Sequence, residues 1–136
     1  MPETMSGSCK CDRVKFQVAG PISMAVNCHC NSCKKLSGSA FSTLVMVDRS
    51  DFKLAGGDGE VTRYQVSDRA TKYFCRICGT PVYNEHVDLP GKLILPVGAL
   101  DNPAIVTPTL NAHCENMLSW VPKIMQMKNF EQSPGG

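Results

Sequence analysis

The sequence of 136 residues has no long hydrophobic run and no concentrated charge. No stretch approaches the roughly 18 apolar residues of a membrane-spanning helix, and the opening MPETMSGSCKC lacks the apolar centre of a signal peptide. The formal net charge is only +2, and no basic run exceeds the pair Lys34 and Lys35, whereas nucleic-acid-binding proteins concentrate basic residues. These absences predict a cytoplasmic protein that binds neither membranes nor nucleic acids.

Helical patterns are also scarce, and short runs of β-branched and aromatic residues between turn formers dominate the chain. The run 13–18 alternates Val14, Phe16 and Val18 with polar residues, which is the period of a half-buried strand. Further strands are expected at 40–47, 51–55, 60–66, 71–75, 80–85, 92–98 and 109–114. This pattern predicts an all-β fold.

Short helical turns are expected only within NSCKKLS at 31–37 and after Gly98. No repeat or linker divides the chain, so we expect one domain over residues 1–136, large enough for its own core. The polar and glycine-rich end, at about 130–136, is expected to form a flexible tail.

Cysteine is unusually frequent, with eight residues, and seven of them fall in three short motifs. In a reducing cytosol such thiols stay free, so clusters of them favour metal ligation over disulfides. The sharpest motif is Cys75-x-x-Cys78-Gly79, because a glycine there accepts the positive φ of a chelating turn. Cys9-x-Cys11 could add two sulfurs and complete a tetrahedral zinc site.

The middle motif offers Cys28, Cys30 and Cys33 from one loop. Three thiolates can hold zinc and leave one coordination position vacant, which distinguishes catalytic from structural zinc. In an alternative partition, Cys30 and Cys33 join Cys75 and Cys78 in a zinc-ribbon-like site, and the remaining cysteines of the motifs are left over. The spacing alone leaves both partitions open.

Several stretches together resemble the glutathione-dependent formaldehyde-activating enzyme family, which includes centromere protein V. They are GSCKC (7–11), CHCNSCKKLSGSAF (28–41), FCRICGTPVY (74–83) and the late His113 followed by Trp120. The resemblance implies a zinc-binding β-tent fold of antiparallel sheets with two zinc ions per chain. It places a structural zinc on Cys9, Cys11, Cys75 and Cys78, and a second zinc on Cys28, Cys30 and Cys33. One departure is Asp12, which stands where the family usually has glycine.

The family's reaction joins glutathione and formaldehyde to S-hydroxymethylglutathione, so the resemblance implies a zinc-dependent carbon-sulfur lyase acting on a small thiol-aldehyde adduct. Glutathione or such an adduct is then the expected partner. Two other classes stay open. One is a non-catalytic, zinc-stabilised binding or scaffold protein, which the presence of centromere protein V in the family suggests. The other is a redox or metal-buffering protein that uses the middle motif.

Residues after the middle motif are candidates for substrate binding. Lys34 and Lys35 could hold a substrate carboxylate, and Ser37, Gly38 and Ser39 could offer amides and hydroxyls. Two ordinary alternatives explain the same residues, namely solvated lysines and a tight turn into the next strand.

Four other residues carry weaker signals. His29 lies between two candidate ligands and is expected to point away from them in a structural role. His113 is a candidate proton relay, with an interior, hydrogen-bonded histidine as the alternative. Cys114 is expected to be an interior thiol, and Trp120 part of the core or a pocket wall.

Overall fold

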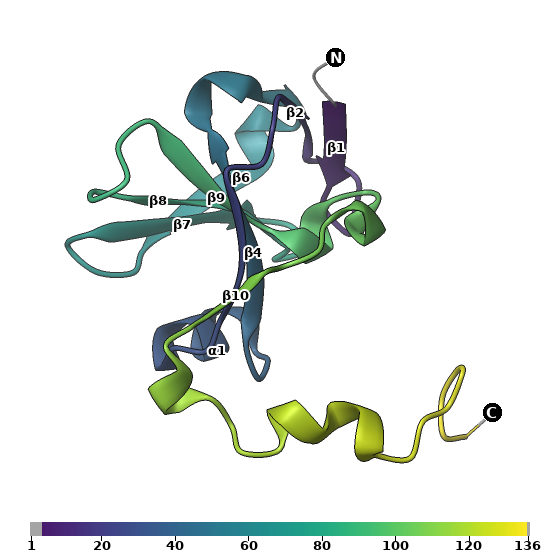
Figure 1. The fold of residues 1–136 in the computed structure, drawn as a ribbon. Coiled ribbons are helices and arrows are strands. Elements are labelled where there is room, and N and C mark those ends of the chain that lie inside the picture. Colours follow the sequence, from purple (N-terminus) through teal and green to yellow (C-terminus); the bar gives the residue numbers. More distant parts are fainter. Residues whose placement is uncertain (1–3, 136) are drawn as a thin grey trace.

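The computed structural model describes residues 4–135, and β-strands dominate them (Figure 1). Ten strands lie within these residues: β1 (Thr4–Ser8), β2 (Lys15–Ala19), β3 (Met24–Cys28), β4 (Ser42–Asp48), β5 (Phe52–Gly56), β6 (Val61–Gln65), β7 (Ala70–Cys75), β8 (Pro81–His86), β9 (Lys92–Pro96) and β10 (Leu110–Ala112). The prediction of an all-β fold is therefore confirmed.

Helices in the described part of the chain are short. One α-helix, α1 (Asn31–Ser37), forms where NSCKKLS predicted a helical turn. The others are 3₁₀ turns: η1 (Arg49–Asp51), η2 (Asp58–Glu60), η3 (Val97–Ala99), η4 (Pro103–Ile105), η5 (Cys114–Asn116) and η6 (Val121–Gln126). Among these residues the structure contains no helix long and apolar enough to cross a membrane.

The strands form two sheets. The smaller has the order β1-β2-β5, and the larger has the order β10-β3-β4-β9-β8-β7-β6. All paired neighbours are antiparallel except β3 and β10, which run parallel with Ala112 opposite Cys28. The sheets are thus antiparallel, as the family resemblance implies, apart from this one pair at the edge. More than eighty residues separate β3 from β10, a connection ample for a parallel crossover.

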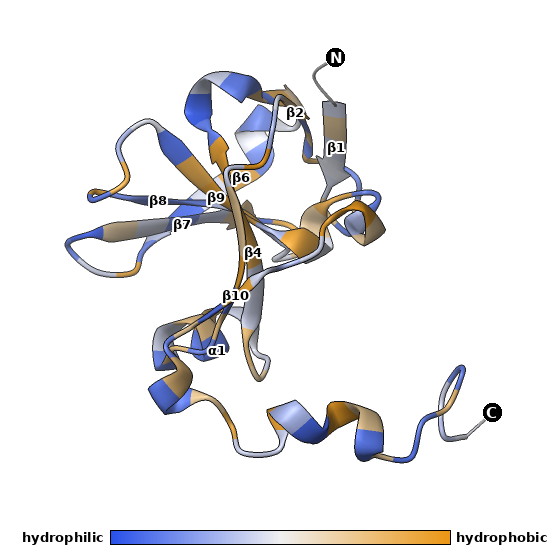
Figure 2. Cartoon of the chain, in the orientation of Figure 1, coloured by the Kyte–Doolittle hydropathy of each residue, from blue (hydrophilic) through white to orange (hydrophobic). Residues whose placement is uncertain are grey.

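The core lies between the two sheets and follows the predicted alternation. Val14, Phe16 and Val18 are all buried, and the Phe16 ring stacks on Phe52 of the neighbouring strand with centroids 5.3 Å apart. Buried positions of β4 and β9 supply the other side, namely Val45, Val47, Leu93 and Leu95. Figure 2 shows this as apolar colour along β4, with polar residues toward the free ends of β7 and β8.

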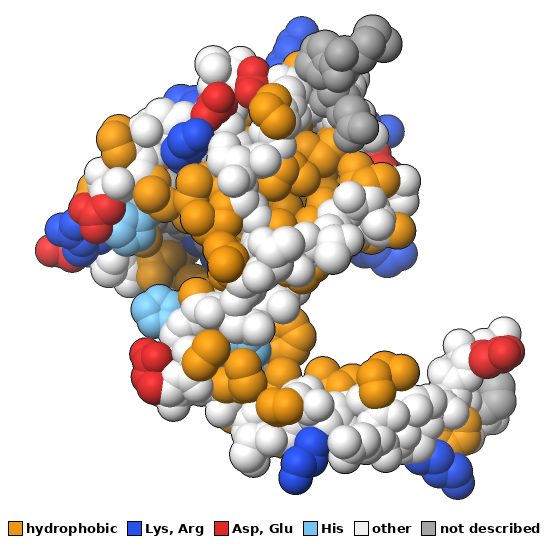
Figure 3. All heavy atoms as spheres, in the orientation of Figure 1, with side chains coloured by type: hydrophobic (Ala, Val, Ile, Leu, Met, Phe, Trp, Pro, Cys, Tyr) orange, Lys and Arg blue, Asp and Glu red, His pale blue; other side chains and the backbone are white. Residues whose placement is uncertain are grey.

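The C-terminal segment leaves the body of the protein after β10 and carries η6 away from the sheets (Figures 1 and 3). Trp120 is 44% exposed there, so the expectation that it belongs to the core is wrong. The physical reason is the path of the chain: between β10 and residue 135 there is no further strand to fold this segment back onto the sheets.

Gly7 is required by close packing. A Cβ built on this residue of β1 would lie 1.9 Å from Cζ of Phe16, its partner across the strands. We therefore expect Gly7→Ala to lower the free energy of unfolding by about 1 to 3 kcal/mol, the usual cost of overpacking. Gly59→Ala is the matched control, since its Cβ meets nothing within 4 Å. Thermal melting checks this, and equal melting temperatures for the two variants would contradict the packing argument.

Candidate metal centres

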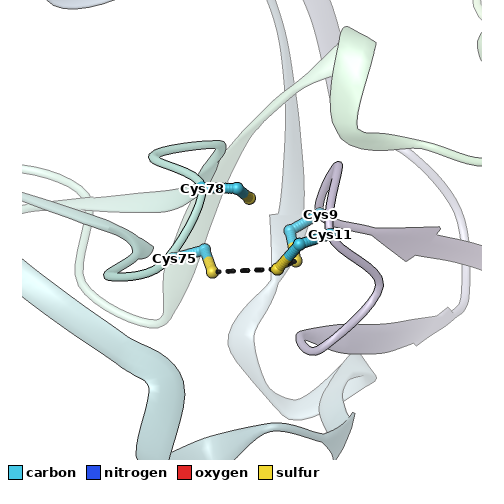
Figure 4. Close-up of side chains that lie close together, drawn as sticks. All are labelled: Cys9, Cys11, Cys75 and Cys78. Atoms are coloured by element: carbon cyan, nitrogen blue, oxygen red, sulfur yellow. Dashed lines mark hydrogen bonds between the residues drawn. The ribbon is translucent and has the colours of Figure 1, made fainter.

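Two segments more than sixty residues apart bring four cysteines together (Figure 4). The loop between β1 and β2 supplies Cys9 and Cys11; Cys75 is the last residue of β7, and Cys78 lies in the turn that leads to β8. Their four sulfurs all lie within 4.8 Å of one another. We call this set the four-sulfur cluster.

The sulfur spacing in the four-sulfur cluster suits a metal ion. Cys11 Sγ lies 3.5 Å from Cys9 Sγ and 3.8 Å from Cys75 Sγ. These distances far exceed a disulfide bond of about 2.05 Å. A tetrahedral zinc with Zn–S distances of about 2.3 Å places its sulfurs about 3.8 Å apart. The residues present therefore fit a zinc ion.

Backbone turns shape both halves of this cluster. In the first, the Val14 N–H donates to Cys9 Sγ over 3.3 Å, and the chain reverses at Asp12, which adopts φ 66°. In the second, the Gly79 N–H donates to the Cys75 carbonyl over 2.8 Å and Gly79 adopts φ 81°. Each chelating pair is thus followed at once by a left-handed residue. Glycine takes this conformation freely, and aspartate is among the few other residues that tolerate it.

Thr80 contacts both cysteine segments of the four-sulfur cluster and lowers the pKa of one thiol. Its Oγ1 accepts the Lys10 N–H over 3.0 Å and lies 3.2 Å from Cys78 Sγ, so the hydroxyl proton is free to point at sulfur. The Thr80 hydroxyl and backbone N–H lower the pKa of Cys78 to about 5. Hydrogen bonds from the Arg13 backbone and side chain also lower the pKa of Cys11, whereas burial raises the pKa of Cys9. Anionic sulfur, the form that metals bind, is thus favoured at the exposed edge of the cluster.

The second cluster comes from one local stretch of chain. Cys28 ends β3, Cys30 is the N-cap residue of α1, and Cys33 lies in the first turn of α1. Their sulfurs lie within 4.8 Å of one another, and no further histidine, aspartate, glutamate or cysteine among the described residues joins this group. We call it the three-sulfur cluster. The structure separates Cys30 and Cys33 from Cys75 and Cys78, contrary to the zinc-ribbon alternative.

Burial and backbone amides act in opposite directions on the three-sulfur cluster. Desolvation raises the pKa of Cys28 and of Cys33. Burial acts in the same sense on Cys30, but hydrogen bonds outweigh it there, chiefly the Cys33 N–H at 3.2 Å, so the pKa of Cys30 is lowered. A cation held by all three sulfurs would offset the cost of burying their charge.

His29, between Cys28 and Cys30, links the three-sulfur cluster to β10. Its ring is buried and packs against the Phe41 ring in a tilted arrangement with centroids 5.0 Å apart, and its Nε2 lies 3.1 Å from Asn111 Oδ1 on β10. The His29 N–H also donates to the Ala112 carbonyl over 3.0 Å. His29 is not among the cluster's candidate ligands, in keeping with the structural role expected from its position.

Some residues predicted to bind substrate make hydrogen bonds within the protein, and one is exposed to solvent. Lys34 Nζ donates to the Asn116 carbonyl over 2.7 Å, and Ser37 Oγ donates to the Cys33 carbonyl over 2.8 Å. Gly38 is the C-cap of α1 with φ 65°, and its N–H donates to the Lys34 carbonyl. All three are thus engaged by the protein itself, and Gly38 ends α1, while Lys35 is exposed to solvent.

His113 and Cys114 lie just beyond β10, on the surface. His113 adopts φ 59°, which turns the chain out of the sheet, and its Nδ1 lies 3.5 Å from Glu115 Oε1. It is therefore not the interior histidine that the sequence allowed. Cys114 follows this turn and is exposed, so the expectation of an interior thiol is wrong. Neither residue belongs to the three-sulfur cluster.

Sequence reasoning overlooked three residues that shape the sites: Thr80, Asn111 and Lys72. Thr80 directly follows the Cys-x-x-Cys-Gly motif, so its position was a usable signal. Asn111 and Lys72 reach their places through strand pairing and carry no local signal. Lys72, on β7, donates from Nζ to the Leu36 carbonyl of α1 over 2.7 Å.

An all-β fold with two cysteine clusters that could hold metal ions defines a class of thiolate metal-site proteins. The comparisons with known proteins give the family. The model of the family described as "Glutathione-dependent formaldehyde-activating enzyme" matches residues 4–116, most of the chain, and the chain belongs to that family.

Individual relatives are distant. A Halomonas elongata protein described as "Putative glutathione-dependent formaldehyde-activating enzyme" is 24% identical over 125 residues, covering 86% of this chain and 79% of that protein. A crystal structure of a Rhodobacter sphaeroides protein matches with a TM-score of 0.65 and 23% identity, covering 79% of this chain and 100% of that chain. At this identity the structural match shows the fold alone.

Asp12 provides a test of the first chelating turn. Because a non-glycine residue in the left-handed region costs about 1 to 2 kcal/mol, offset partly by the greater freedom of glycine in the unfolded chain, Asp12→Gly should raise the free energy of unfolding by about 0.5 to 1 kcal/mol. Thermal melting measures this. Asp68→Gly is the control. Asp68 lies outside the left-handed region, so glycine there should slightly lower the free energy of unfolding. A lower melting temperature for Asp12→Gly would contradict the account of this turn.

Proposed function

We propose that this protein is a zinc-dependent carbon-sulfur lyase that forms or cleaves the hemithioacetal between a small thiol such as glutathione and formaldehyde. In the forming direction, the thiol sulfur bonds to the aldehyde carbon, the carbonyl π electrons move to oxygen, and the thiol proton ends on that oxygen. The reverse direction breaks the same carbon-sulfur bond. No oxidant or reductant is required.

The observation that carries this proposal is the incomplete ligand set of the three-sulfur cluster. Cys28, Cys30 and Cys33 gather three sulfurs, and no fourth candidate ligand from the described residues joins them. Zinc bound there would supply a Lewis acid with a position open to a soft sulfur ligand. In the four-sulfur cluster, by contrast, the protein itself can supply all four ligands that a structural zinc requires.

The chain's own residues hold the three sulfurs in place. Cys28 is fixed by the pairing of β3 with β4 and β10, and Cys30 Sγ is fixed by the Cys33 N–H. Lys34 ties α1 to the segment after β10 through the Asn116 carbonyl. These contacts limit the motion of the ligands, which favours a preorganised site for an incoming thiol.

Membership in the family supports a thiol and an aldehyde as substrates, and the name of the Halomonas elongata relative points to the same pair. The experiments below also distinguish this lyase from two other classes of protein. A scaffold would keep both metals without turnover. A redox or metal-buffering protein would show variable metal loading and reversible disulfides.

Cys30→Ser tests the three-sulfur cluster. We expect the variant to fold, to lose one zinc per chain, and to lose most of its ability to accelerate exchange between glutathione, formaldehyde and their adduct. Anaerobic native mass spectrometry gives the zinc content, and exchange spectroscopy by NMR gives the rate above the uncatalysed reaction. Cys114→Ser is the matched control, because Cys114 is exposed and outside both clusters. Full acceleration by Cys30→Ser would refute the assignment.

Cys78→Ser tests the four-sulfur cluster. Since a structural metal contributes directly to folding free energy, this variant should unfold or melt at a far lower temperature, although Cys78 is exposed and packs little apolar surface. Circular dichroism and thermal melting follow the change, with Cys114→Ser again as control. An unchanged melt would show that the metal, if bound, does not support the fold.

A further inference from the structure

A hollow lies between the C-terminal half of α1 and the larger sheet, next to the three-sulfur cluster. Its lining comes from α1 and four strands: Leu36, Ser37, Ser42, Leu44, Lys72, Pro81, Asn84 and Pro96. Cys33, Leu36 and Ser37 are spaced three and four residues apart, so they share one face of the helix. The hollow therefore begins about one helical turn, or about 5.4 Å, along α1 from Cys33.

Hydrogen bonds connect the hollow to this cysteine. Ser42 Oγ donates to the Cys33 carbonyl over 3.2 Å, and Ser37 Oγ donates to the same carbonyl over 2.8 Å. Both serines line the hollow. The hollow therefore lies against the stretch of α1 that carries Cys33.

Lys72 gives this hollow a positive charge that no protein carboxylate balances. The lining contains no aspartate or glutamate, and no carboxylate among the described residues lies within ion-pair distance of Lys72 Nζ. Within residues 4–135 the Lys72 ammonium makes one hydrogen bond, to the Leu36 carbonyl, which uses one of its three donors. Its other contact is the ring of Phe74, 5.7 Å from Nζ. Partial burial lowers the pKa of Lys72, as expected for a charge that lacks a partner.

We propose that Lys72 binds a carboxylate of the thiol substrate in this hollow while the thiol reaches the three-sulfur cluster. This inference rests on the proposed function and adds to it a preference for thiols that carry a carboxylate. The apolar walls from Leu44, Pro81 and Pro96 strengthen the ion pair by excluding water. Lys34 and Lys35 suit this role less well, because Lys34 is engaged by Asn116 and Lys35 faces solvent.

The alternative role for Lys72 is purely structural. An ammonium beside the last carbonyls of a helix caps it and interacts favourably with its dipole. A capping role would affect every thiol equally and would lower the melting temperature. A carboxylate-binding role would affect only substrates that carry a carboxylate.

The test compares Lys72→Met with Lys72→Arg on three thiols: glutathione, 3-mercaptopropionate and the uncharged 2-mercaptoethanol. Loss of a charged hydrogen bond should raise the KM for the two carboxylates about 10-fold to 100-fold in Lys72→Met and leave the KM for 2-mercaptoethanol unchanged. Lys72→Arg should restore part of the affinity. Lys53→Met is the matched control, an exposed lysine on β5 of the other sheet. Equal effects on all three thiols, or no effect on any, would overturn the inference.

Binding of glutathione, measured by calorimetry without formaldehyde, separates this inference from the proposed function. If the wild-type protein binds glutathione and Lys72→Met binds it at least 10-fold more weakly, the inference stands even where no lyase turnover is detected. If the affinities are equal, or the wild-type protein does not bind glutathione, the inference fails, whatever the turnover with formaldehyde.

Discussion

The central constraint on this structure is the meeting of four sulfurs, two from the loop between β1 and β2 and two from the end of β7 and the turn that follows it. These segments belong to different sheets, so the four-sulfur cluster ties the smaller sheet to the larger one at a single point. Cys9 and Cys75 are also members of the apolar core. Thiols brought this close repel one another once they ionise, and the low pKa of Cys78 means that at least one is anionic at neutral pH. A metal cation held by the four sulfurs would resolve that conflict and make the cluster a source of stability.

The two clusters differ in what they demand of the fold. The four-sulfur cluster needs two distant segments to meet, whereas the three-sulfur cluster spans only Cys28 to Cys33 and is held by the end of β3 and the start of α1. Losing a ligand from the first removes a link between sheets. Losing a ligand from the second leaves every strand pairing in place. This difference in connectivity is why we propose a structural role for the four-sulfur cluster and a catalytic role for the three-sulfur cluster.

The sequence predicted most of the strands because their alternation of apolar and polar residues is strong, as in the run Val14, Phe16 and Val18. Strands β1 and β3 were not predicted. Their sequences, TMSGS and MAVNC, show little alternation of apolar and polar residues, and they become strands by pairing with other strands. Spacing grouped the cysteines within each motif but left open which motifs meet, because that depends on the path of the chain. Trp120 and Cys114 were misplaced for the same reason, since the left-handed His113 directs the chain outward.

Apart from the N-cap that Cys30 gives to α1, the three-sulfur cluster has no evident structural purpose, and that bears on function. A domain already linked by four sulfurs gains little from three more thiols at the end of β3 and the start of α1, and burying the Cys33 thiol opposes its ionisation. Groups held in an unfavourable state usually persist where a site requires them. The uncompensated charge of Lys72 lies against the C-terminal end of α1, at the Leu36 carbonyl, and poses the same question. A substrate with a thiol at one end and a carboxylate at the other would answer both, because its sulfur would complete the ligand set of a metal held by the three cysteines and its carboxylate would neutralise the lysine.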